Sequence, residues 1–168
     1  MDIIPLLQDK KIFAELIDEI GARLTAPNIA APEARGFLFA APLLVTDSKA
    51  HNLITFRKSG KLPANEGDLQ KVAIVKEYGE DNLFFRKSDL CNALVSNGVV
   101  EITILDDILA TGGTALEMAR HLEALRVEKD GVEYPVKVKE FIFLADLSFL
   151  HGKELLEEIA PVYSLITF

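Results

Sequence analysis

Two adjacent carboxylates, Asp106 and Asp107, stand between an apolar run and a glycine-rich segment. Valine, isoleucine and leucine dominate the run at 99–105, which is typical of a buried strand. The segment 110–114 reads Ala-Thr-Gly-Gly-Thr and opens a stretch with helical apolar spacing. A helix start offers backbone N–H groups, glycines allow close approach, and threonines add hydroxyl donors, so this segment suits a phosphate. Because an acidic pair accepts hydrogen bonds from a sugar diol, the pattern predicts a site for a phosphorylated ribose.

Simpler interpretations exist for each part of this pattern. An Asp-Asp pair can cap a helix, and two glycines can form an ordinary turn. No lysine follows the glycines as in a P-loop, and the G-x-G-x-x-G spacing of dinucleotide sites is absent, so nucleoside triphosphates and NAD are poor candidates. The residues that we predict to hold phosphate and ribose are Asp106, Asp107, Ala110, Thr111, Gly112, Gly113 and Thr114.

Two further segments combine positive charge with glycine. Arg35 and Gly36 lie at the expected junction between a short apolar strand and a helix, and a guanidinium there can bind an anion. Arg57, Lys58 and Lys61 lie in the loop Arg-Lys-Ser-Gly-Lys-Leu-Pro at 57–63. Arg35 can also be an ordinary surface arginine, and the loop an ordinary solvated one. We predict anion binding at both because the chain carries a net charge of −8, so an anionic ligand needs local cations.

The bulk properties restrict the class of protein. A length of 168 residues suits a single domain spanning 1–168, and the acidic balance argues against nucleic acid or an anionic membrane as partner. Cys91 is the only cysteine, which suits a reducing cytoplasm, and we expect its side chain to be buried. The three histidines show no metal-ligand spacing, so we expect no protein-bound metal.

Apolar periodicity predicts strands that alternate with helices. This order indicates an α/β fold, a mostly parallel twisted sheet with helices on both faces, whose ligands gather at the carboxyl ends of the strands. The expected helices are 9–24, 37–45 and 147–158; the expected strands are 28–31, 53–56, 99–105, 135–145 and 162–168; and 69–76 with 83–86 form a hairpin joined by 77–82.

The segment 104–114, Ile-Leu-Asp-Asp-Ile-Leu-Ala-Thr-Gly-Gly-Thr, resembles the phosphoribosyl diphosphate (PRPP) signature of the type I phosphoribosyltransferases. Three further stretches resemble the adenine branch of that family: Ala-Arg-Gly-Phe-Leu-Phe at 34–39, Phe-Arg-Lys-Ser-Gly-Lys-Leu-Pro at 56–63 and Glu-Tyr-Gly at 77–79. The C-terminal segments 149–154 and 163–165 fit the same branch. The resemblance covers the chain from about residue 2 to its end.

The resemblance implies transfer of the phosphoribosyl group of PRPP to adenine, giving AMP and pyrophosphate in purine salvage. It implies that residues 110–114 hold the 5′-phosphate and that the aspartate pair holds the ribose hydroxyls. The pyrophosphate would contact Arg35, with Gly36 and Phe37 beside it, and the basic loop with Arg57, Lys58 and Lys61. Glu77 would manage the proton on N7 of the base, with Tyr78 beside it on a closing loop.

The family also implies Mg²⁺ carried by PRPP oxygens, a homodimer, a cytoplasmic location and a cis peptide at Glu33–Ala34. Family members carry an N-terminal stretch ending in Phe-Arg that forms part of a hood over the base, and this sequence begins after it. We therefore expect a reduced hood, and an open base pocket, a cover from another segment or subunit, and a later start than the natural one all stay open. A different base, such as hypoxanthine, guanine or xanthine, and a non-catalytic PRPP or nucleotide sensor are the alternative functions.

Overall fold

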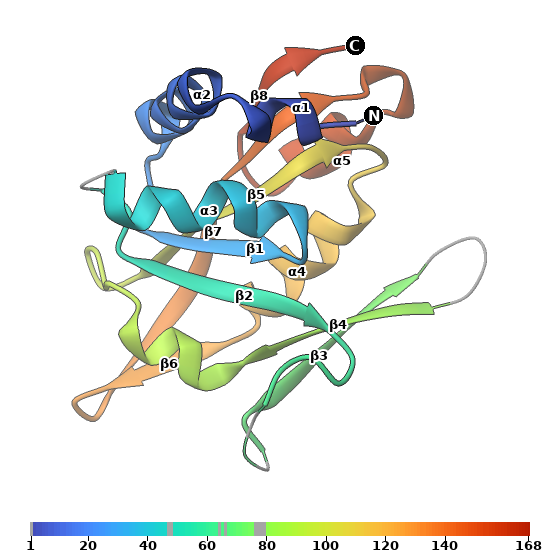
Figure 1. Cartoon of the computed structure of the whole chain (residues 1–168). Coiled ribbons are helices and arrows are strands. Elements are labelled where there is room, and N and C mark those ends of the chain that lie inside the picture. Colours follow the sequence, from blue (N-terminus) through green and yellow to red (C-terminus); the bar gives the residue numbers. More distant parts are fainter. Residues whose placement is uncertain (1, 47–48, 64, 66, 76–79) are drawn as a thin grey trace.

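A computed structural model describes residues 2–46, 49–63, 65, 67–75 and 80–168. The chain forms one eight-stranded mixed sheet with helices on both faces, as expected from the alternating apolar pattern (Figure 1). The strands are β1 (Asn28–Pro32), β2 (Asn52–Lys58), β3 (Leu69–Val75), β4 (Glu80–Arg86), β5 (Val100–Leu109), β6 (Arg126–Lys129), β7 (Val132–Asp146) and β8 (Val162–Thr167). The helices are α1 (Ile4–Gln8), α2 (Lys10–Arg23), α3 (Arg35–Thr46), α4 (Gly113–Glu123) and α5 (Gly152–Glu157), with short 3₁₀ turns η1 (Lys87–Asn92) and η2 (Ser148–Leu150).

Parallel pairing dominates the centre of the sheet. The strand order is β3-β4-β2-β1-β5-β7-β6, and β8 pairs with the other end of β7. β1 runs parallel to β2 and β5, and β7 runs parallel to β5 and β8. The carboxyl ends of these strands therefore meet at one edge, where ligands of such sheets bind. Strand β4 of the β3–β4 hairpin pairs antiparallel with the end of β2, and the hairpin extends beyond the main body (Figure 1).

The two faces of the sheet form two apolar clusters. Ile29 and Ala31 of β1 pack in the cluster that α1, α2 and α3 cover, whereas Ala30 packs in the cluster under α4 and α5. This alternation follows from the two-residue period of a strand. Helix α2 begins directly after its N-cap Asp9, whose carboxylate accepts hydrogen bonds from Lys11 N at 2.8 Å and Ile12 N at 3.0 Å.

Several boundaries differ from the sequence-based expectation. β5 continues through both aspartates to Leu109, so the pair lies within the strand and not after it. β7 begins at Val132 and forms an antiparallel hairpin with β6 that the sequence pattern did not indicate. β4 begins at Glu80, inside the expected hairpin connection. The expected helix 147–158 is interrupted at His151, whose φ of 56° is left-handed. Within the described residues, no helix is long and apolar enough to cross a membrane.

A buried glutamate side chain connects three parts of the chain through hydrogen bonds. Glu140 of β7 is 1% exposed and accepts hydrogen bonds from Thr25 N, Thr25 Oγ1 and Thr103 Oγ1, each at 2.7 Å. It thereby ties the α2–β1 connection to β5 and β7. A buried charge of this kind is tolerated only because its oxygens are hydrogen-bonded.

Replacing this carboxylate should therefore destabilise the fold. We expect Glu140→Ala to lower the free energy of unfolding by about 3 kcal/mol, because the buried donors of Thr25 and Thr103 lose their acceptor. Urea denaturation measures the change. Glu133→Ala, an exposed glutamate on the same strand, is the control and should change the value by less than about 0.5 kcal/mol. Equal losses in the two variants would show that the Glu140 hydrogen bonds do not stabilise the protein.

Candidate active site

The aspartate pair lies near the carboxyl end of the central strand β5. Asp107 is 4% exposed, and its backbone N–H donates a 2.8 Å hydrogen bond to Asp106 Oδ1. Asp107 Oδ2 lies 2.9 Å from Arg35 Nε, which forms an ion pair across two neighbouring strand ends. Apart from this ion pair, the oxygen accepts no hydrogen bond of good geometry from the residues that the structure describes. Asp107 is thus buried and anchored, and Asp106 beside it is half-buried.

The pKa of the Asp106 carboxyl is raised to about 7. Burial is the main cause and the neighbouring charge of Asp107 adds to it, whereas the Asp107 backbone N–H and the Arg35 guanidinium act to lower the pKa. Asp106 therefore loses its proton less readily than an exposed aspartate does.

The glycine-rich segment forms a hollow directly after β5. Residues 108–115 line a cavity of about 100 Å³, together with Asp106 and Phe143. Gly112 has a φ of +78°, a left-handed conformation that glycine adopts without strain, and α4 begins at the next residue. The N–H groups of the first turn of α4 therefore meet the hollow at the positive end of the helix dipole. The size and the donors suit one phosphate group.

Arg35 begins α3 immediately after the carboxyl end of β1. The Glu33–Ala34 peptide before it is cis, as the resemblance implied. Gly36 is buried, and a Cβ there would lie 3.1 Å from Leu105 O and 3.2 Å from Asp106 Oδ1. Such contacts are tighter than ordinary packing, so a glycine is needed for α3 to lie this close to β5. The close approach brings Arg35 to the aspartate pair.

The basic segment 57–61 is divided between the end of β2 and a tight turn. Lys61 N donates to Lys58 O at 3.2 Å, and Gly60 between them has a φ of +73°. The Arg57 side chain lies on Glu33, with 2.5 Å between Arg57 Nε and Glu33 Oε2, and its guanidinium lies 5.8 Å from the ring centre of Phe37. The Lys58 backbone N–H also donates to Glu33, at 2.8 Å.

Glu33 is a functional candidate that sequence reasoning missed. Partial burial acts to raise the pKa of its carboxyl, but hydrogen bonds from Arg57 and from the Lys58 backbone outweigh that effect and hold the pKa below its ordinary value. The only signal in the sequence is its place just before the Ala-Arg-Gly segment. A carboxylate there fixes the direction of the basic segment.

A second hollow of about 310 Å³ joins these parts into one cleft. Its lining includes Glu33 and Arg35 after β1, Lys58 at the end of β2, and both aspartates. Asp106 and Thr114 line this hollow and the smaller one as well, so the two are contiguous. The structure thus brings the aspartate pair, the glycine-rich segment, Arg35 and Lys58 together. Arg57, paired with Glu33, and Lys61, exposed in the turn, are outside this lining set.

Two predicted residues, Glu77 and Tyr78, lie outside the described residues. Among those that are described, no group of three or more His, Cys, Asp or Glu side chains could hold a metal ion. Described parts of the β3–β4 hairpin, Ile74, Asp81 and Leu83, form one wall of the larger hollow.

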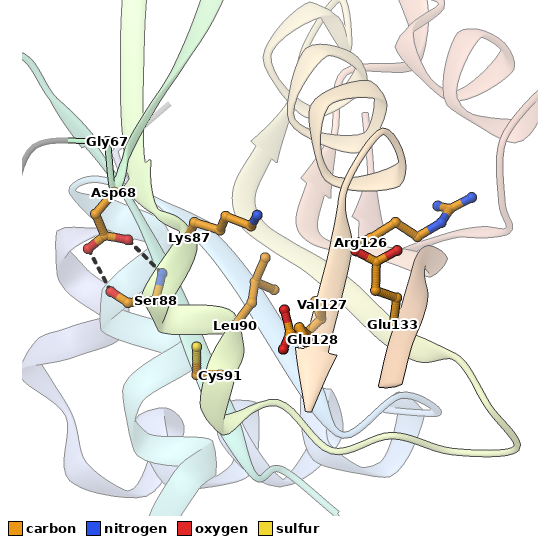
Figure 2. Close-up of a pocket in the computed structure, with 10 residues that line it drawn as sticks. All are labelled: Gly67, Asp68, Lys87, Ser88, Leu90, Cys91, Arg126, Val127, Glu128 and Glu133. Atoms are coloured by element: carbon orange, nitrogen blue, oxygen red, sulfur yellow. Dashed lines mark hydrogen bonds between the residues drawn. The ribbon is translucent and has the colours of Figure 1, made fainter. Parts of the chain in front are cut away.

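A separate hollow of about 350 Å³ lies between η1 and the β6–β7 hairpin (Figure 2). None of the predicted site residues lines it. Asp68 closes one end by accepting hydrogen bonds from Ser88 N and Ser88 Oγ, both at 2.7 Å. Cys91 in its wall is exposed, so the expectation of a buried thiol was wrong. The reason is that Leu90, which is 1% exposed, supplies the inward-facing apolar side chain of this turn.

Comparisons with known proteins agree with the motifs. No protein-family model matches the sequence. The adenine phosphoribosyltransferases of Clostridium acetobutylicum and Caldanaerobacter subterraneus subsp. tengcongensis are each 38% identical to this chain. The alignments cover 91% and 99% of this chain and 79% and 86% of the relatives, respectively.

Solved structures give the same result. The adenine phosphoribosyltransferase of Thermoanaerobacter pseudethanolicus superposes with a TM-score of 0.79 at 36% identity, covering 99% of this chain and 87% of the other. The enzyme of Saccharomyces cerevisiae, complexed with an imino-altritol bisphosphate and adenine, gives a TM-score of 0.73 at 30% identity, covering 98% and 85%. On this evidence the chain belongs to the adenine phosphoribosyltransferase family.

Proposed function

We propose that the protein transfers the phosphoribosyl group of PRPP to adenine and releases AMP and pyrophosphate, a purine salvage reaction. The observation that carries this proposal is the single cleft in which a phosphate-sized hollow adjoins the aspartate pair and two cations. PRPP has this sequence of groups: a 5′-phosphate, a ribose diol and a pyrophosphate. Adenine as the acceptor is supported by the family and by the adenine-bound yeast relative.

The 5′-phosphate would occupy the hollow at residues 110–114. Backbone N–H groups at the start of α4 and the hydroxyls of Thr111 and Thr114 would donate to its oxygens. The ribose hydroxyls would then reach Asp106 and Asp107, which line the adjoining hollow. Because both aspartates are anchored before the ligand arrives, little reorganisation is needed on binding.

The pyrophosphate would lie against Arg35 and Lys58, with Gly36 and Phe37 beside it. Negative charge grows on the departing pyrophosphate while positive charge develops on the ribose ring. Fixed cations therefore stabilise the transition state more than the ground state. Arg57 and Lys61 would join this contact as the basic loop closes and excludes water, for which Arg57 must exchange its Glu33 partner for the phosphate.

Magnesium fits this arrangement as a companion of PRPP. Asp107 Oδ2 is a buried carboxylate oxygen that is ion-paired with Arg35 but accepts no hydrogen bond from the described chain, and oxygen ligands are what Mg²⁺ prefers. Because no three His, Cys, Asp or Glu side chains of the described chain are grouped so as to hold a metal ion, most of its ligands would be PRPP oxygens and water. When bound, Mg²⁺ neutralises charge on the leaving pyrophosphate.

The base would be handled by the Glu-Tyr-Gly segment at 77–79. We propose that Glu77 holds the proton lost from N7 of adenine as the new bond forms, and that Tyr78 adjoins it on the closing loop. This assignment rests on the sequence match alone. General acid–base assistance of this kind contributes about 10²–10⁴-fold to a rate.

We further propose that the protein acts as a cytoplasmic homodimer, as the family resemblance implies. Exposed apolar side chains on α3 support a partner near the site, because Leu38 is 40% and Val45 is 86% exposed on the helix that begins with Arg35. A partner covering this helix would lie beside the cleft.

The proposed reaction can be tested with purified protein, Mg²⁺, PRPP and a panel of adenine, hypoxanthine, guanine and xanthine. We expect AMP formation with a kcat/KM for adenine at least about 100-fold above that for the other bases, because such discrimination needs only about 2.7 kcal/mol. Glu77→Gln should lower kcat for adenine by about 100-fold. The double variant Asp106→Ala/Asp107→Ala sets the background. Absence of AMP above that background would refute the proposal, and preference for another base would reassign the substrate.

The raised pKa of Asp106 predicts an effect of pH on stability. The carboxyl is protonated in both folded and unfolded states below its ordinary pKa of 3.8, and ionised in both above about 7. Ionisation is harder in the folded state, so this group destabilises the fold increasingly as pH rises between those values. We expect Asp106→Asn to become more stable than the wild type by on the order of 3 kcal/mol from pH 4 to pH 8.

Urea denaturation at several pH values measures this difference. Asp130→Asn, at an exposed left-handed turn position, is the control. The difference in free energy of unfolding between this variant and the wild type should be the same at every pH. A stability difference between wild type and Asp106→Asn that does not vary with pH would contradict the account.

The homodimer can be measured by size-exclusion chromatography with light scattering. The mass should be twice that of the 168-residue chain, and Leu38→Glu should shift it toward the monomer because a charge would be buried in the interface. Glu19→Lys, an exposed substitution on α2 that removes only a surface ion pair with Arg23, is the control and should leave the dimer intact. A monomeric wild type would remove this part of the proposal.

A further inference from the structure

The chain between β7 and α5 has a shape that its sequence pattern does not predict. A continuous helix over 147–158 would be the simplest structure, but His151 adopts a left-handed conformation and α5 starts afresh at Gly152. Leu147 N donates a 2.9 Å hydrogen bond to Leu109 O, which fixes this connection against the end of β5. The break therefore turns the start of α5 toward the phosphate hollow.

Gly152 lies against the back of the glycine-rich segment. A Cβ at this position would lie 2.9 Å from Gly112 N and 2.9 Å from Thr111 C, and it would overlap the carbonyl oxygen of Ala110. These three groups belong to the backbone, which cannot swing aside as a flexible side chain can. The φ of Gly152 is outside the left-handed region, so glycine is required here for space and not for conformation.

The contact is reciprocal. A Cβ on Gly112 would lie 2.9 Å from Gly152 O and 3.4 Å from Leu156 Cγ, and Leu156 is fully buried. The front of the glycine-rich segment lines the hollow, and its back packs on α5. The orientation of the carbonyl and N–H groups in this segment is therefore fixed by the close backbone contact between Gly112 and Gly152.

We propose that Gly152 is a positioning residue for the 5′-phosphate: its missing side chain lets α5 hold residues 110–112 in place, so that the Thr111 hydroxyl and the N–H groups at the start of α4 face the ligand. This inference rests on the proposed function. It predicts that an added methyl group displaces the segment and weakens binding of the phosphate end of PRPP, while the pyrophosphate end at Arg35 and Lys58 is unaffected.

Gly152→Ala tests this, because alanine suits the first position of a helix and adds only the methyl group. Isothermal titration with ribose 5-phosphate should show a Kd at least about tenfold higher than that of the wild type. The Kd for pyrophosphate with Mg²⁺ should change less than about twofold, and KM should rise for PRPP but not for adenine. A general loss of stability would weaken the binding of both ligands, so it would not produce this selective change in Kd.

Lys153→Ala, an exposed substitution at the next residue, is the matched control and should leave both affinities unchanged. Should Gly152→Ala fail to fold, Leu156→Val weakens the same contact from α5 and should raise the ribose 5-phosphate Kd selectively by about threefold. Unchanged ribose 5-phosphate binding, or equal loss of both ligands, would overturn the inference. A wild type that binds ribose 5-phosphate but makes no AMP would refute the proposed reaction and leave this test standing.

Discussion

The ion pair between Arg35 and Asp107 is the constraint on which the site depends. It joins the helix that follows β1 to the neighbouring strand β5, with 2.9 Å between Nε and Oδ2. Parallel pairing of β1 and β5 brings these two ends to one edge, and Gly36 removes the side chain that would keep α3 away. A cation and the aspartate pair, of which Asp107 is buried, are thereby held together before any ligand binds. The energy needed to assemble this part of the site is spent during folding.

The protein as a whole repels the ligand that we propose for it. With a net charge of −8, long-range attraction of a polyanion is weak, so recognition depends on local groups: Arg35, Lys58 and the N–H groups at the start of α4. These groups lie on different elements and face one cleft, which keeps the cations apart from one another. Two of the basic residues, Arg57 and Lys58, are also bound to Glu33 through a side chain and a backbone N–H. That carboxylate limits the repulsion within the basic segment when no anion is present.

Sequence patterns predicted the sheet and most of the segments that line the cleft, because both depend on local composition. Buried strands are recognisable as apolar runs, and the Thr-Gly-Gly-Thr segment forms its phosphate-sized hollow through backbone geometry that its own residues determine. Features set by tertiary contacts were missed. The break at His151 accompanies the close approach of Gly152 to the backbone of residues 110–112, which are distant in sequence. The pairing of Arg57 with Glu33 is equally non-local, and the side chain of Cys91 is exposed because Leu90 fills the interior position instead.

The central claim is that one cleft holds both ends of PRPP, with the ribose between them on the aspartate pair. A crystal structure of the protein with AMP, pyrophosphate and Mg²⁺ tests this most directly. The account predicts the AMP phosphate in the hollow of residues 110–114, the ribose hydroxyls on Asp106 and Asp107, and the pyrophosphate within hydrogen-bond distance of Arg35 and Lys58. Phosphate groups found elsewhere, or a ribose that does not contact the aspartate pair, would contradict it.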